Sequence, residues 1–301
     1  MSVFETDSRL PFTAGIVAML AVLGAMIASI LGAVLTPVSI ITFIYILIAT
    51  ALLPLMVMIG WQTTGYVRSS YALDRNALVI RWGDVREIVP MADIQRVIAA
   101  TDIIDGLHFR RIPLPGWWHG AGHHPALGRL IFYSTEGLQN QIVVITPDRN
   151  YVISPYDADA FLDAFNARFD MRPTQHITYS HMQPQYMNWW FWRDRTAHLL
   201  LLVMLIVHLG LVALATGRYP TAQAQIPLHF DAAGLVDRVG PRTQIFIPVI
   251  AGTVLLLLST VAGLLIYARR ERGLAYLLWG GNMAVQVMFA IAVFTIGFAT
   301  A

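Results

Sequence analysis

The stretch that decides the fold is AGIVAMLAVLGAMIASILGAVL at residues 14–35, which contains no charged residue. About 20 helical residues span the hydrocarbon core of a bilayer, so this stretch predicts a membrane-spanning helix. Four further apolar runs follow at residues 40–60, 196–215, 245–267 and 274–298. The sequence therefore predicts an α-helical membrane protein with five transmembrane helices, two before and three after a long polar insertion.

The composition supports this class and excludes several kinds of site. Hydrophobic residues make up 56% of the chain and charged residues only 13%, which is unlike a soluble domain. The absence of cysteine excludes disulfides, thiolate metal sites and a cysteine nucleophile. A net charge of +2 is too small to indicate a nucleic-acid partner. The first partner we expect is the lipid bilayer, and we expect no cofactor.

Segment 1–61 is predicted to be an N-terminal two-helix membrane hairpin. Residues 1–10 lack the basic region and the cleavage site of a secretory signal, so we expect the first span to be retained. The link at residues 36–39 is too short for anything except a tight reversal. The second span is therefore expected to return antiparallel to the first.

Segment 62–172 is predicted to be a soluble sheet domain, because apolar residues alternate in it and turn residues separate the runs. The strand candidates are residues 71–73, 77–82, 94–100, 129–134, 141–146 and 151–154. Residues 157–169 predict an amphipathic helix, with Phe161, Phe165 and Phe169 on one apolar stripe. We expect a small barrel-like sheet whose open end this helix covers.

A pattern of residues runs through this segment: Val89-Pro90, Ile94, Pro115-Gly116, GRLIFYS at 128–134, Ile145-Thr146, YVISP at 151–155, Asp159 and Phe161. In these residues, segment 81–167 resembles a bacterial pleckstrin-homology-like (PH-like) domain. The resemblance implies a seven-strand barrel with a C-terminal helix, used for docking or assembly. Between Arg68 and Arg172 there are 11 Arg against 12 Asp and Glu, which argues against a surface for acidic lipid headgroups.

Residues 101–127 are predicted to be a long loop rich in aromatic and basic side chains. Trp prefers the membrane interface, so this loop is a candidate for contact with the interface or with a partner. The candidate contact residues are Arg110, Arg111, Trp117, Trp118 and His119. His119, His123 and His124 could instead supply imidazole ligands to one metal, although no carboxylate stands nearby in sequence.

Segment 173–195 is predicted to be an aromatic connector, and segment 196–301 a three-helix membrane domain. His208 lies in the middle of the third span, where interhelical hydrogen bonding is the favoured role and axial ligation of a pigment the alternative. Asn282 and Gln286 are four residues apart in the fifth span and share one helix face. Buried amides of this kind usually join helices.

The loop 217–244 between the third and fourth spans carries a second motif. Its residues are Ile226, Pro227, His229, Phe230, Asp231, Gly234, Asp237 and Gly240. At this spacing the loop resembles a short bacterial domain of unknown function found in SdpI-like toxin-immunity and signalling membrane proteins. From the residues themselves two hypotheses stay open. One is a rigid cap held by Asx-type hydrogen bonds, and the other is a metal or acid–base cluster around His229.

The placement of Arg predicts the orientation in a bacterial inner membrane. The predicted cytoplasmic positions are Arg68, Arg193, Arg195, Arg269, Arg270 and Arg272. The N-terminus and residues 62–195 are then cytoplasmic, whereas loop 217–244 and the C-terminus are extracytoplasmic.

The spans carry no acidic residue and no Arg, which argues against a transporter or a membrane enzyme. We therefore expect a non-enzymatic sensor, immunity or scaffold protein that contacts other membrane or cytoplasmic proteins. The alternative is an accessory structural subunit of a larger membrane complex.

Overall fold

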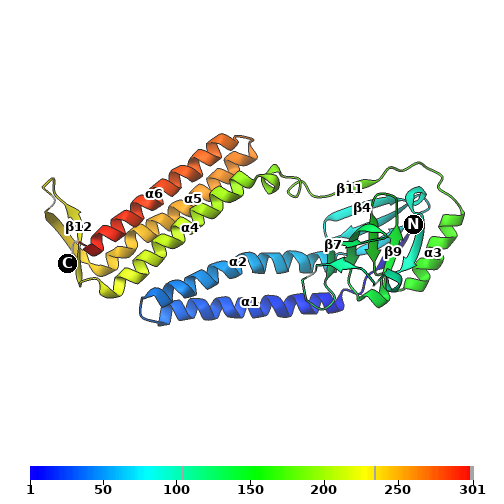
Figure 1. Ribbon diagram of the computed structural model, residues 1–301, viewed down its shortest axis with the longest axis horizontal. Coiled ribbons are helices and arrows are strands. Elements are labelled where there is room, and N and C mark those ends of the chain that lie inside the picture. Colours follow the sequence, from blue (N-terminus) through cyan, green and yellow to red (C-terminus); the bar gives the residue numbers. More distant parts are fainter. Residues whose placement is uncertain (104, 111, 234, 299–301) are drawn as a thin grey trace. The chain divides into compact units, whose positions relative to one another are not determined.

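The computed structural model describes residues 1–298 apart from 104, 111 and 234. Contacts divide the chain into two compact units, residues 1–23 with 54–188 and residues 24–53 with 189 onward. The dividing points at residues 23/24 and 53/54 lie within the first two helices, so each of these helices contributes to both units. Figure 1 shows the helices and strands, coloured along the sequence from blue at the N-terminus to red at the C-terminus.

Within the described residues, five helices are long and apolar enough to cross a membrane, as the sequence predicted. They are α1 (Arg9–Leu35), α2 (Ile40–Val67), α4 (Arg195–Arg218), α5 (Ile247–Ala268) and α6 (Arg272–Phe298). Helices α1 and α2 pack closely, because a Cβ on Gly15 would lie 2.2 Å from Thr63 Oγ1. Helix α2 runs beyond the predicted end at residue 60 and leads directly into the sheet domain.

The polar insertion contains two sheets and a C-terminal helix, α3 (Ala158–Asp170). The first sheet has the order β1 (Ser2–Glu5), β2 (Ser70–Leu73), β3 (Ala77–Trp82), β4 (Val85–Pro90) and β11 (Ser180–Met182). The second has the order β5 (Arg96–Ala99), β9 (Ile142–Ile145), β10 (Asn150–Ile153), β8 (Gly128–Ser134), β7 (Trp118–His124) and β6 (His108–Phe109).

The closed barrel implied by the sequence is wrong for the described residues. Strand β4 pairs with β11 on the edge that does not face β3, so it is not available for pairing with β5. The short helix η1 (Met91–Asp93) follows β4 and separates the two strands along the chain. The two sheets therefore stay separate ladders.

Several strands lie where none was predicted: β1, β4, β6, β7, β11 and the two strands of the loop 217–244. Strand β1 comes from the N-terminal residues and pairs with β2, with Val3 opposite Ala72. Strand β11 lies inside the predicted connector 173–195, and β7 lies inside the predicted loop 101–127. Strands β1 and β11 pair with segments distant in sequence, so local patterning carries little information about them, whereas β7 forms a hairpin with the next strand, β8.

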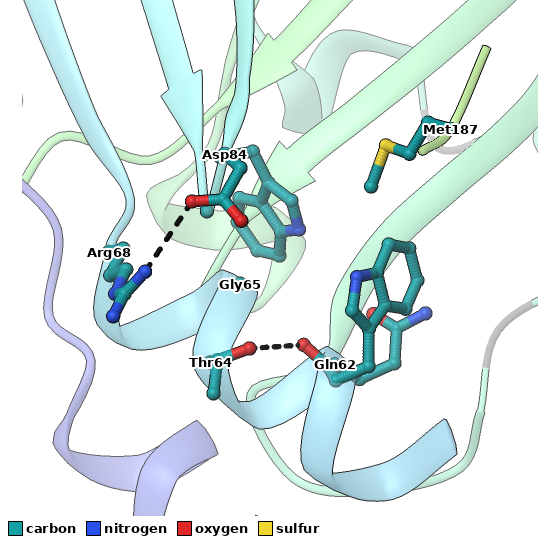
Figure 2. Close-up of a pocket in the computed structure, with 9 residues that line it drawn as sticks. Gln62, Thr64, Gly65, Arg68, Asp84 and Met187 are labelled. Atoms are coloured by element: carbon teal, nitrogen blue, oxygen red, sulfur yellow. Dashed lines mark hydrogen bonds and ion pairs between the residues drawn. The ribbon is translucent and has the colours of Figure 1, made fainter. Parts of the chain in front are cut away.

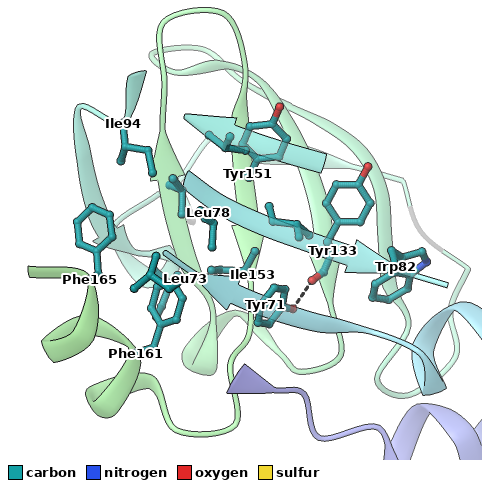
Figure 3. Close-up of a cluster of buried hydrophobic side chains, with 14 of the residues drawn as sticks. Tyr71, Leu73, Leu78, Trp82, Ile94, Tyr133, Tyr151, Ile153, Phe161 and Phe165 are labelled. Carbon is teal, nitrogen blue, oxygen red and sulfur yellow. Dashed lines mark hydrogen bonds between the residues drawn. The ribbon is translucent and has the colours of Figure 1, made fainter. Parts of the chain in front are cut away.

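The main core of the sheet domain lies between the sheets and α3 (Figure 3). Asp157 caps α3 by accepting a hydrogen bond from the N–H of Ala160 at 2.9 Å. Phe161 and Phe165 are buried against the sheets, as the predicted stripe required, whereas Phe169 is 40% exposed. The stripe therefore ends one turn before the helix does.

Helices α4, α5 and α6 form a bundle that carries the hairpin of β12 (Gln225–Phe230) and β13 (Val236–Pro241). Gly263 of α5 allows Trp279 of α6 to approach, because a Cβ there would lie 2.1 Å from Trp279 Nε1. The same indole nitrogen donates to Ser259 O at 3.0 Å. Glycine at position 263 thus makes room for the Trp279 side chain between the two helices.

Candidate functional site

The hairpin β12–β13 contains two irregularities that direct its side chains. Pro227 pairs with Val239 and His229 with Arg238, so Leu228 is an extra residue on β12. Leu228 packs beside Gly240, where a Cβ would approach its Cδ1 to 2.5 Å. A side chain at position 240 would therefore displace the end of the Leu228 side chain.

The second irregularity makes Asp237 the extra residue on β13, between the pairs of His229 with Arg238 and of Phe230 with Val236. A bulge of this kind redirects a side chain. Here it accompanies an ion-pair geometry in which His229 Nδ1 lies 2.7 and 2.8 Å from the two carboxylate oxygens of Asp237. The side chains of His229 and Asp237 are 66% and 47% exposed, so the pair is accessible from solvent.

Asp231 bonds to backbone groups, unlike Asp237, which bonds to a side chain. Its Oδ1 accepts hydrogen bonds from the N–H groups of Ala233 and Leu235 at 2.9 and 2.8 Å, and its own N–H donates to Leu235 O at 2.8 Å. These contacts form the Asx-type cap that was one of the two hypotheses. Gly234 of the motif lies outside the described residues, and Phe230 is the last residue of β12.

The hairpin is anchored on one side and exposed on the other. Ile226 is fully buried against the helix ends, and Pro227 beside it is also buried. Leu235, Val236 and Val239 are 67%, 45% and 55% exposed. The loop thus exposes apolar side chains close in sequence to Asp237.

A polar cluster in the bundle connects all three helices. His208 of α4 lies with Nδ1 3.1 Å from Gln286 Oε1 on α6 and with Nε2 3.2 Å from Thr253 Oγ1 on α5. Gln286 Nε2 donates to Gly252 O at 2.7 Å. His208 is 6% exposed and Gln286 is fully buried, so the structure places both side chains in interhelical contacts.

Asn282 makes a second set of contacts one turn away from Gln286. Its Nδ2 donates to Ser259 Oγ on α5 at 2.7 Å and lies 3.2 Å from Met204 Sδ on α4. Its Oδ1 is buried without a hydrogen-bond partner among the described residues. The two amides on α6 therefore hold the bundle at two levels.

Replacing Gln286 tests this cluster. Gln286→Leu is expected to destabilise the bundle by about 1–2 kcal/mol, because His208 Nδ1 and Gly252 O lose their partner inside the membrane. The measurement is the denaturant midpoint of the full chain in detergent. Met288→Leu is the matched control, since Met288 lies on the same helix and is 67% exposed. Equal midpoints for the two variants would contradict the structural role.

Residues 118–124 of the predicted loop 101–127 are instead strand β7, which pairs with β8. Trp117 is buried, 1% exposed, and its Nε1 donates to Pro11 O at 2.9 Å. Trp118 stacks with Phe109 at 5.9 Å. Arg110 is exposed, and Arg111 lies outside the described residues. A partner contact through Arg110 stays a prediction.

The three histidines considered as metal ligands, His119, His123 and His124, do not form a metal site. His119 stacks on Trp82, with ring centroids 4.8 Å apart. Both ring nitrogens of His124 face backbone groups, Asp105 O at 3.0 Å and the N–H of Ala126 at 3.2 Å. Among the described residues, no group of three or more His, Asp or Glu side chains could hold a metal ion.

Asp194 is a functional-site candidate that sequence reasoning missed. Its Oδ1 accepts from the N–H of Ala197 at 3.0 Å and caps α4, while Oδ2 accepts from Tyr267 at 2.7 Å and from Tyr276. Desolvation raises the pKa of the Asp194 carboxyl, but the hydrogen bonds from Tyr276 and Tyr267 outweigh it and hold the pKa at about 2. The available signal was an Asp immediately before an apolar helix.

The comparisons with known proteins agree with this anatomy. The family model described as "Bacterial PH domain" matches residues 69–169, and "Domain of unknown function (DUF1648)" matches residues 205–253. No curated protein and no solved structure matches the chain. The chain is a membrane protein with a PH-like domain and a DUF1648 domain. The second match includes His208, the hairpin, Gly252 and Thr253, so one domain carries both the exposed ion pair and much of the polar cluster.

Proposed function

We propose that this protein is a non-enzymatic, multi-pass membrane sensor, immunity or scaffold protein that acts through protein–protein contacts. The observation that carries the proposal is the exposed face of the hairpin. Its apolar residues Leu235, Val236 and Val239 are exposed and flank Asp237 in sequence, and the His229–Asp237 pair is exposed as well. Exposed apolar residues beside fixed polar groups are typical of a protein-binding surface.

In this proposal the protein lies in a bacterial inner membrane, with the N-terminus and residues 62–195 in the cytoplasm. The hairpin within 217–244 and the C-terminus lie outside, which the Arg-rich turn at residues 269–272 supports. The hairpin then meets an extracytoplasmic ligand or toxin, as the SdpI-like resemblance implies. The PH-like domain holds a cytoplasmic partner.

Site-specific photo-crosslinking in native membranes tests the proposal. A crosslinking residue at Val239 is expected to produce a discrete protein adduct, whereas one at Met288, which is 67% exposed on the membrane-spanning helix α6, is not. Asp237→Asn should reduce the Val239 adduct by loosening His229. Lipid adducts alone at Val239, or equal protein adducts at both positions, would contradict a partner surface here.

A second candidate, an accessory subunit of a membrane complex, is favoured by a different observation. A cavity of about 370 Å³ lies between α5 and α6 and is lined mainly by apolar side chains together with Ser259, Gly281 and Asn282. Such a surface suits another transmembrane helix. A subunit is expected to copurify stoichiometrically with integral proteins whether or not Asp237 is replaced, whereas a sensor associates conditionally.

A further inference from the structure

The cavity of about 370 Å³ between α5 and α6 lies within the three-helix bundle. Apart from Ser259 and Asn282, its lining consists of Leu, Val and Ala side chains together with Gly281. A Cβ on Gly281 would meet no atom within 4 Å, so no neighbouring side chain fills the space at this glycine. Leu258 and Leu277 of the lining are 62% and 73% exposed, so the cavity opens on the outer surface of the bundle.

Asn282 is a buried polar side chain in this lining, and its contacts fix the orientation of its amide. The residue is 7% exposed. Its Nδ2 donates to Ser259 Oγ at 2.7 Å and to Leu255 O at 3.4 Å, and it lies 3.2 Å from Met204 Sδ. A carbonyl oxygen and a thioether sulfur only accept hydrogen bonds, so the nitrogen of the amide, and not its oxygen, faces them.

The other end of the amide, Asn282 Oδ1, is a buried acceptor without a hydrogen-bond partner among the described residues. The hydroxyl of Ser259 does not supply the missing donor, because it donates to Leu256 O at 3.1 Å. An unpaired amide oxygen is costly in a hydrocarbon environment. A molecule held in the cavity contacts the side chain that carries this acceptor, and a hydroxyl group on that molecule would satisfy it.

A second cavity, at the end of α2, differs in size and polarity (Figure 2). Gln62 lines it, and Gln62 Oε1 is also buried without a partner among the described residues. This cavity has a volume of about 30 Å³ and charged lining residues, Arg68 and Asp84, so it suits a water molecule. The cavity beside Asn282 is far larger and mainly apolar, and large apolar cavities exclude water and bind apolar molecules.

The cavity beside Asn282 lies near the middle of the membrane spans. Asn282 is ten residues after Arg272, where α6 begins, and Ser259 is nine residues before Ala268, where α5 ends. At 1.5 Å per residue, both lie about 14–15 Å along their helices, which is half of the ~30 Å hydrocarbon core. Phospholipid headgroups lie outside this core and acyl chains carry no donor, so a phospholipid does not satisfy Asn282 Oδ1.

A neighbouring transmembrane helix is a poor source of the missing donor. Its backbone N–H groups bond within the helix, and its Ser and Thr hydroxyls bond to carbonyls of the preceding turn. The threonines Thr216, Thr253 and Thr260 of this bundle do so, at 2.9, 2.8 and 2.7 Å from the carbonyl oxygen four residues earlier. The hydroxyl of a lipid has no such competing acceptor in the hydrocarbon core.

We propose that this cavity binds a long-chain alcohol of the membrane, an apolar lipid with a hydroxyl and no charged headgroup. The hydroxyl donates to Asn282 Oδ1, and the chain lies against the leucines and Val285. A charged headgroup is excluded at this depth because the lining contains no charged side chain that could pair with it. The inference goes beyond the proposed function and does not depend on the hairpin.

Photolabelling of the full chain in phospholipid nanodiscs tests the site. The probe is a long-chain primary alcohol with a diazirine in its chain, and it is expected to label residues 255–262 and 277–285. The unlabelled alcohol is expected to compete about tenfold better than its methyl ether, because the ether keeps the chain but cannot donate to Asn282 Oδ1. Equal competition by the alcohol and the ether would overturn the proposal.

Gly281→Leu fills the cavity without removing a hydrogen bond of Asn282. It is expected to reduce the labelling by about tenfold or more, because the space for the chain is lost. Gly280→Leu is the matched control, since a Cβ there also meets no atom within 4 Å but Gly280 does not line the cavity. Where Gly281→Leu fails to fold, Ala262→Leu fills the cavity from α5. Labelling of a folded cavity-filling variant at the wild-type level would overturn the site.

A crosslinking residue at Leu277 distinguishes the lipid from the transmembrane helix that the second candidate function requires. In native membranes it is expected to give lipid adducts and no discrete protein adduct. A discrete protein adduct at Leu277 would overturn the lipid site and favour the accessory subunit. Loss of the Val239 adduct, by contrast, would remove the proposed function and leave this inference standing.

Discussion

Trp117→Ala is expected to lower the free energy of unfolding of the sheet domain by about 3–5 kcal/mol. The indole is 1% exposed, donates to Pro11 O at 2.9 Å and lies 5.2 Å from the ring of Tyr66. Truncation removes packing against both α1 and α2 and leaves a cavity. The measurement is the urea midpoint of the full chain in detergent, followed by near-ultraviolet circular dichroism.

Trp117→Phe is the matched control for this change. It keeps an aromatic ring but loses the hydrogen bond to Pro11 O. The expected loss of free energy of unfolding is therefore smaller: about 1 kcal/mol for the hydrogen bond, in addition to the loss from the smaller buried area. A Trp117→Ala variant as stable as wild type would contradict the buried position. In that case the interface role that the sequence indicated for this tryptophan would be the better interpretation.

Acid is expected to destabilise the sheet domain through His119. Burial lowers the pKa of this imidazole from 6.5 to about 4, and the ring stacks on Trp82 at an interplanar angle of 5°. Between these two values the unfolded chain binds a proton that the folded chain does not. The contribution of His119 to the free energy of unfolding is therefore fully present above pH 6.5. It is lost as the pH drops from 6.5 to about 4, by about 3 kcal/mol in total.

His119→Phe isolates this contribution from the other titrating groups. The difference in free energy of unfolding between wild type and the variant is expected to shrink or reverse in favour of the variant as the pH falls through this window. Urea titrations at a series of pH values measure it. Parallel pH curves for the two proteins would show that His119 is solvated and titrates normally.

The candidate site was predictable where its contacts are local. Asp231 caps backbone groups within four residues of itself, and the residue types and spacing in the loop indicate such a turn. Gln286 and Asn282 could be paired as one helix face from the 3.6-residue period alone. His208 lies with Gln286, but which groups face it depends on how α4, α5 and α6 pack.

The residues that sequence reasoning missed gain their roles from distant partners. Glu87 stands among alternating strand residues and looks like an exposed charge until Tyr133, Tyr179 and His181 surround it. Asp194 needs Tyr267 and Tyr276, which lie more than seventy residues away in sequence. Asp237 and His229, by contrast, were both candidate residues in the sequence, although the register shift at Asp237 has no clear sequence signal.

The sequence by itself determined the five membrane helices, the α3 stripe and most strands of the insertion, because apolar run length and periodicity act within one element. Only the tertiary structure decided that β1 and β11 complete the first sheet, that Trp117 is core rather than interface, and that the two sheets do not close. Those outcomes depend on which strand edges pair and which side chains pack together, and the partners are far apart in the sequence. Strand pairing and burial are satisfied by partners that local sequence does not specify.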